Sequence, residues 1–76
     1  MTAIPDVCIT SSQRSGLRIR IAEERAETLY HLEEYVEDKE WWSCLSHSYH
    51  PANLAIGWND PAMIAAIAEM LTEVLM

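Results

Sequence analysis

The chain is poor in glycine, in basic residues and in long apolar runs. Its two glycines stand far apart, so the sequence contains no glycine-rich loop of the kind that binds phosphate groups. No window approaches the roughly 18 consecutive apolar residues that a membrane-spanning helix needs, and we expect no membrane span. The first twelve residues have neither a basic start nor a sustained apolar stretch, so we expect no secretory signal peptide.

Acidic residues far outnumber basic ones. Five lysines and arginines stand against twelve aspartates and glutamates, which gives a net charge of −7 with neutral histidines. Nucleic acids and anionic membranes are themselves negative, so this charge argues against direct binding to either and favours a basic protein partner. Two cysteines without an export signal indicate reduced thiols and a cytoplasmic location.

The length and composition predict one small folded domain over residues 1–76. A chain of this length buries only about 60% of the surface that its unfolded form exposes, so its core is marginal. Half of the residues are hydrophobic, which argues against disorder. The bulky side chains must therefore supply the core, unless a metal ion or a partner adds stability.

The periodicity of apolar residues predicts an α+β fold in the order ββαββα. Alternating side chains predict four strands, over residues 6–12, 16–21, 42–49 and 53–58. Strong helix formers at helical spacing predict a helix over residues 22–40. Asp60 and Pro61 predict the N-cap and the first residue of a second helix, which continues to the C-terminus. We expect an antiparallel sheet of about four strands with both helices packed on one face.

Most of the negative charge falls in the first of these predicted helices. Residues 23–40 contain eight carboxylates and two cations, a net charge of −6. On a helix the carboxylates share one arc with Tyr30, an aromatic type that is enriched at binding hot spots. A solvated helix surface accounts for such an arc equally well. As a binding surface, it would contact a basic protein through Glu23, Glu27, Tyr30, Glu34, Glu37, Asp38 and the neighbouring Trp42.

Cys44, His47 and His50 follow one another at intervals of three residues. Thiolate and imidazole are zinc ligands, and Cys8 or His31 could complete a set of four. On a strand, however, residues three apart point to opposite faces, so a zinc site requires a sharp turn within this segment. We therefore expect no metal ion or cofactor unless the backbone turns between Cys44 and His50.

We expect no catalytic activity. A cysteine nucleophile needs a cation or a helix N-terminus to stabilise its thiolate, and the surroundings of Cys44 are acidic. The carboxylate pairs Glu33–Glu34 and Glu37–Asp38 could transfer protons only within a cleft, and 76 residues leave little room for one.

In its size and acidity the chain resembles phage-encoded inhibitors of host defence, such as anti-CRISPR proteins. The resemblance implies an inhibitor that covers a nucleic-acid-binding surface of its partner, and it assigns no role to any residue. Two other functions are compatible with the sequence. One is a small module stabilised by zinc at Cys44, His47 and His50, and the other is a homodimeric accessory subunit that associates through its apolar C-terminal helix.

Overall fold

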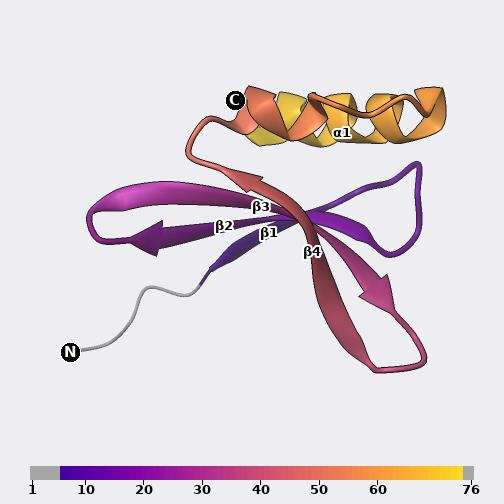
Figure 1. The fold of residues 1–76 in the computed structure, drawn as a ribbon, viewed down its shortest axis with the longest axis horizontal. Coiled ribbons are helices and arrows are strands. Elements are labelled where there is room, and N and C mark those ends of the chain that lie inside the picture. The colour runs from indigo at the N-terminus through magenta and orange to yellow at the C-terminus, as the bar shows by residue number, and fades with distance from the viewer. Residues whose placement is uncertain (1–5, 75–76) are drawn as a thin grey trace.

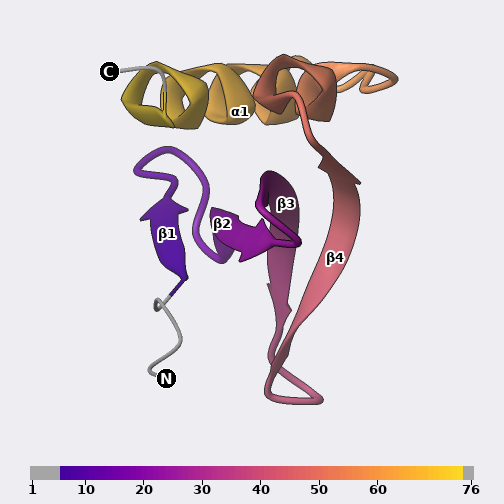
Figure 2. The ribbon, with the colours of Figure 1, turned by 90° about the vertical axis from the view of Figure 1, so that its left-hand side faces the viewer.

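Strands that are neighbours in the chain are also neighbours in the sheet. The computed structural model describes residues 6–74. Its elements are β1 (Val7–Thr10), β2 (Leu17–Glu24), β3 (Glu27–Val36), β4 (Trp41–Ser48), the short 3₁₀ helix η1 (Pro51–Ala55) and α1 (Pro61–Val74). The four strands form one antiparallel sheet in the order β1-β2-β3-β4. Helix α1 lies along one face of this sheet, and no other helix or strand of residues 6–74 covers the opposite face (Figures 1 and 2).

The alternation in β2 directs its apolar side chains to the face below α1. Leu17 and Ile19 are fully buried there. Ile19 pairs with Ile9 of β1 on one side and with Leu32 of β3 on the other, so three strands contribute to the same apolar layer. The strands predicted over residues 6–12, 16–21 and 42–49 are confirmed as β1, β2 and β4.

Helix α1 supplies the second layer of the core. The Asp60 carboxylate accepts a hydrogen bond from the backbone N–H of Ala62 at 3.0 Å, and Pro61 is the first helical residue, which confirms the predicted start of this helix. The predicted end of the helix at residues 75 and 76 lies outside the described residues. The side chains that α1 buries against the sheet recur at helical spacing and are Met63, Ala66, Ile67 and Met70.

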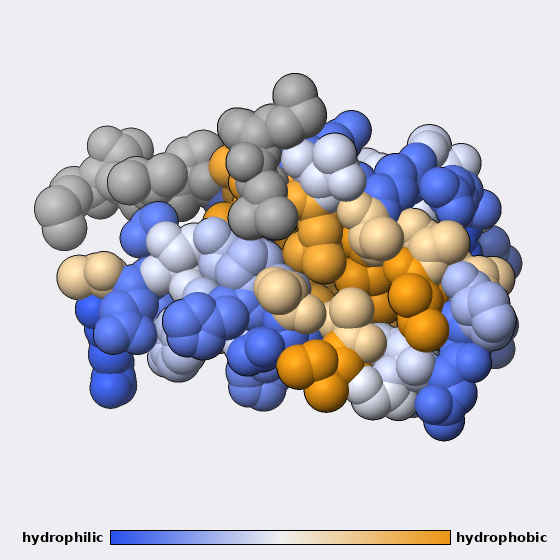
Figure 3. Space-filling view, turned by 90° about the horizontal axis from the view of Figure 1, so that it is seen from above, coloured by the Kyte–Doolittle hydropathy of each residue, from blue (hydrophilic) through white to orange (hydrophobic). Residues whose placement is uncertain are grey.

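Apolar side chains also reach the surface on the α1 side of the molecule (Figure 3). Ile64 of α1 is 39% exposed, and Ile56, in the segment that leads to the helix, is 74% exposed. These side chains gather in one area of the surface, to which we assign no role.

The predicted helix over residues 22–40 is wrong. This segment forms the end of β2, a two-residue turn of Arg25 and Ala26, the whole of β3 and the turn before β4. Both turn residues have positive φ angles, 52° and 66°, as in a type I′ hairpin turn. An isolated two-stranded hairpin is only marginally stable in water, whereas a sheet of three or more strands can be stable. β3 pairs along the whole of β2 and also with β4, so it is an inner strand of the larger sheet. This pairing outweighs the helix propensity of the segment.

The predicted strand over residues 53–58 is wrong as well. Its alternating residues fall on η1 and the loop that follows, where Leu54 enters the core and Ile56 points to solvent. The indole N–H of Trp58 donates a hydrogen bond to the carbonyl oxygen of Leu54 at 3.0 Å, which holds the loop after η1 against η1. Over residues 6–74 the fold is therefore α+β with four consecutive strands and one α-helix, instead of the expected ββαββα order with two helices.

Candidate binding site

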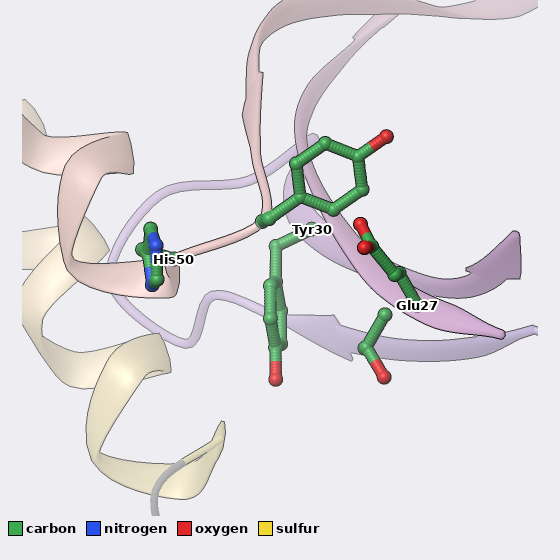
Figure 4. A pocket seen from close by; sticks show the side chains of 5 residues that line it. Glu27, Tyr30 and His50 are labelled. Atoms are coloured by element: carbon green, nitrogen blue, oxygen red, sulfur yellow. The ribbon is translucent and has the colours of Figure 1, made fainter.

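An open pocket lies where the start of β3 faces the chain that follows β4 (Figure 4). Its volume is about 460 Å³, within the range of roughly 300–1,000 Å³ that is typical of ligand pockets. In Figure 4, Tyr30 lies between Glu27 and His50. The side chains that line the pocket are Glu27, Thr28, Tyr30, Tyr49 and His50.

Strand pairing and one side-chain hydrogen bond position the pocket residues. Tyr30 pairs with Ser48 at the end of β4, and its ring also packs against the hydrophobic core, which holds one wall in place. The hydroxyl of Ser48 accepts a hydrogen bond from the backbone N–H of His50 at 3.1 Å, and this contact fixes the bend after β4. Tyr49, between these two residues, is 54% exposed and free to contact a ligand.

The hairpin tip beside the pocket holds three carboxylates and one cation, Arg25. Glu24 and Glu27 stand directly opposite each other on β2 and β3, and Glu23 is one position further along. Among the described residues, no lysine, arginine or histidine forms an ion pair with any of these three carboxylates. Like charges directly across a hairpin are destabilising, so the sequence keeps this charge at a cost in stability. The Thr28 hydroxyl donates a hydrogen bond to Glu23 at 3.0 Å.

The other predicted binding residues lie elsewhere on the sheet. Glu37 and Asp38 are in the turn after β3, about 33 Å from Glu27 by the rise of a ten-residue strand. Glu34 forms an ion pair with Arg14 at 3.4 Å. The single acidic arc is absent, because the helix on which it depended does not form. Of the predicted set, only Glu27 and Tyr30 line the pocket, with Glu23 beside them.

The uncovered face of the sheet carries a buried carboxylate. Glu33 is 4% exposed, and its two oxygens accept hydrogen bonds from Nε of Arg18 at 2.8 Å and from Nε of Arg20 at 3.0 Å. The pKa of Arg20 is raised, first by its hydrogen bond to Asp6 and also by Glu33. Sequence reasoning grouped Glu33 with Glu34 as a possible proton-transfer pair, but adjacent residues of a strand point to opposite faces.

Trp42, another predicted binding residue, belongs to this uncovered face. The Arg18 guanidinium lies 3.9 Å from the centre of its ring, and the ring meets Tyr35 edge to face at 5.4 Å. Both contacts stabilise Trp42 within the fold. Trp42 is therefore part of the sheet and takes no part in the pocket.

A β-bulge in β4 rearranges the cysteine and histidine residues of the 44–50 segment. Cys44 pairs with Glu33 and His47 pairs with His31, so Leu45 is the additional residue of β4. Because residues 31 and 33 are two apart on β3, the bulge brings Cys44 and His47 to the same face, contrary to the expectation from regular alternation. His50 lies in the pocket and is separate from this group.

The thiol of Cys44 lies beside the His31 imidazole, with 3.9 Å between Sγ and Nδ1. Burial and the charge of Glu33 raise the pKa of Cys44, while burial and the charge of Arg20 lower the pKa of His31. Both groups therefore favour their neutral forms, and a protonated thiol is a poor nucleophile. The arrangement gives no support to catalysis by Cys44.

In the conformation of residues 6–74, no three histidine, cysteine, aspartate or glutamate side chains are arranged to hold a metal ion. No helix in the described part of the chain is long and apolar enough to cross a membrane. The chain matches no protein-family model, no curated protein and no solved structure. Function must therefore be inferred from the geometry of the chain itself.

Proposed function

We propose that the protein is a non-enzymatic binding protein that docks on a basic protein surface through the pocket at the β2–β3 tip. The observation that carries this proposal is one open pocket that combines two tyrosines, Tyr30 and Tyr49, with the Glu27 carboxylate, which forms no ion pair within residues 6–74. The carboxylate attracts a cation, and a tyrosine ring adds about 0.5–2 kcal/mol when a cation lies over its face. A lysine or arginine side chain of the partner has the charge and the length to enter this pocket.

The charge around the pocket supports a basic partner. Glu24 lies opposite Glu27 across the hairpin, Glu23 accepts a hydrogen bond from Thr28 of the pocket, and the chain as a whole has a net charge of −7. Such a field accelerates encounter with a basic protein and repels phosphate groups. Direct binding of nucleic acid to this site is therefore not part of the proposal.

The proposal includes an inhibitory role. Protein surfaces rich in lysine and arginine are the surfaces on which nucleic acids bind, because the phosphate backbone supplies most of that affinity. An acidic domain docked there competes for the same cations. This is the role implied by the resemblance to anti-CRISPR proteins.

Fluorescence anisotropy with a labelled lysine- and arginine-rich peptide tests the proposal. We expect Glu27→Gln and Tyr49→Ala each to weaken binding by about three- to tenfold, since each removes about 1 kcal/mol of interaction with the cation. Circular dichroism would establish that both variants keep the fold, which is expected because the two side chains lie at the surface.

The matched control is Glu37→Gln, which removes one carboxylate from the other end of β3. It changes the net charge by the same amount as Glu27→Gln. Because Glu37 lies at the opposite end of β3 from the pocket, well beyond a Debye length of about 10 Å, we expect the affinity to stay within about twofold of the wild type. Equal losses in the Glu27 and Glu37 variants would mean that net charge binds the peptide, and would refute a role for the pocket.

A further inference from the structure

Three side chains with metal-binding chemistry lie together on the uncovered face of the sheet. They are His31 of β3 and Cys44 and His47 of β4, which we call the Cys/His cluster. The bulge at Leu45 creates this grouping, because regular alternation would place Cys44 and His47 on opposite faces. Bulges are frequent where a strand has to redirect a side chain toward a functional site.

Two of the ligand atoms are already near the separation that a metal ion requires. Around a tetrahedral zinc ion, a sulfur at about 2.3 Å and a nitrogen at about 2.0 Å stand about 3.5 Å apart. Sγ of Cys44 and Nδ1 of His31 are 3.9 Å apart. A shift of a few tenths of an ångström in either side chain brings both into the ligand shell.

His47 is placed to supply the third ligand after one side-chain rotation. Its ring centre is 6.0 Å from that of His31, whereas two imidazoles on one zinc ion have ring centres about 5 Å apart. As the side chains lie, the three do not form a complete ligand set. Because His47 is exposed, its ring can turn toward the cluster with little loss of packing.

We propose that His31, Cys44 and His47 bind one divalent metal ion of the zinc class. Thiolate and imidazole together select zinc or a similar transition metal over magnesium and calcium, which prefer oxygen ligands. Three protein ligands leave a fourth position for water or for a side chain of a partner. The ligand set differs from Cys44, His47 and His50, because His50 lines the pocket.

Metal binding would join the two strands at one edge of the sheet. Strand β4 is the last strand in the sheet order, and its hydrogen bonds to β3 are the ones that the bulge interrupts. The Cys44 thiol binds as thiolate, and its proton passes to the solvent. The bound ion should stabilise the β3–β4 pairing.

Titration of the reduced, untagged protein with Co²⁺ and Zn²⁺ tests the site. We expect one Co²⁺ per chain with a thiolate-to-metal charge-transfer band, and one added zinc ion in the native mass spectrum. Cys44→Ser should abolish the charge-transfer band. His47→Ala should weaken Zn²⁺ binding by more than about tenfold, since loss of even an indirect metal partner costs that much.

The matched controls are Cys8→Ser and His50→Ala, which remove the same residue types outside the cluster. Both should bind the metal as the wild type does. Absence of one-to-one binding, unchanged binding in the Cys44 and His47 variants, or an equal loss in His50→Ala would each overturn the proposed ligand set. Because the cluster and the pocket share no residue, the peptide affinity tests the proposed function separately.

Discussion

The Glu33 carboxylate forms an ion pair with Arg18 across β3 and β2 at 2.8 Å, although only 4% of Glu33 is exposed. Its second oxygen pairs with Arg20, two residues along β2. A charge buried to this extent is tolerated only when hydrogen-bonded partners satisfy it. The register between β2 and β3 supplies these partners, so the ion pairs and the strand pairing depend on each other.

Removal of the buried carboxylate should destabilise the protein. In Glu33→Ala, Arg18 and Arg20 lose their common partner, and we expect the free energy of unfolding to fall by about 2 kcal/mol. The loss is moderated because both arginines are partly exposed and can turn toward water. Urea denaturation followed by circular dichroism measures the change.

The control for this prediction is Glu34→Ala, one residue further along β3. Its ion pair with Arg14 is longer, at 3.4 Å, and both side chains are about two-fifths exposed, so its loss should cost less than about 0.5 kcal/mol. Similar losses in the two variants would contradict the assignment of Glu33 as the buried partner of the arginines.

Substitution of the hairpin turn distinguishes the observed fold from the helix that the sequence predicts. Ala26 has a φ angle of 66°, a conformation that glycine adopts at little cost. Ala26→Gly should therefore stabilise the protein by about 1 kcal/mol. Within a helix the same change would destabilise by about 1 kcal/mol, so the sign of the effect decides between the two. Ala22→Gly, within β2, should be destabilising and serves as the control.

The contact between α1 and the β1–β2 loop should make stability depend on pH. Glu69 of α1 accepts hydrogen bonds from the hydroxyl groups of Ser12 and Ser11, and these bonds, first the one from Ser12, lower its pKa below the ordinary value of 4.5. The charged form is favoured in the folded state. This contribution to stability is therefore fully present above about pH 4.5 and is lost as the pH falls through the lowered pKa.

Thermal unfolding at a series of pH values tests this contact. Glu69→Gln should show a weaker decline in stability between neutral and strongly acidic pH than the wild type. Glu73→Gln, on the same helix but outside the contact, should decline as the wild type does. A wild-type slope in Glu69→Gln would mean that the contact does not contribute to stability.

The parts of the fold that sequence reasoning predicts are those where local signals and tertiary packing agree. Residues 16–21 alternate cleanly and form most of β2, and the Asp60–Pro61 pair begins α1. In residues 22–40 the local signals and the tertiary packing disagree. Glutamate and alanine favour a helix, while pairing with β2 and the charge of its arginines favour a strand, and nothing local reveals that pairing. The turn also lacks the usual glycine or asparagine, since Arg25 and Ala26 occupy it.

The same misassignment explains what the sequence could and could not reveal about the site. The sequence groups Glu27 and Tyr30 on one arc of a helix that does not form, and both line the pocket from β3 instead. Tyr49 comes from the chain after β4, so only the pairing of β4 with β3 brings it to the pocket. The bulge at Leu45 is likewise set by pairing, and the 44–50 segment contains no glycine to mark it.

Chemical-shift mapping tests the central claim most directly. The ¹⁵N-labelled protein is titrated with the lysine- and arginine-rich peptide, and the backbone amide shifts are followed residue by residue. The pocket predicts that the largest changes fall at residues 27–30 and 49–50, with little change in the acidic turn at residues 37–40. Equal changes at both acidic ends of β3, or the largest changes at residues 37–40, would contradict the claim that this pocket binds the basic partner.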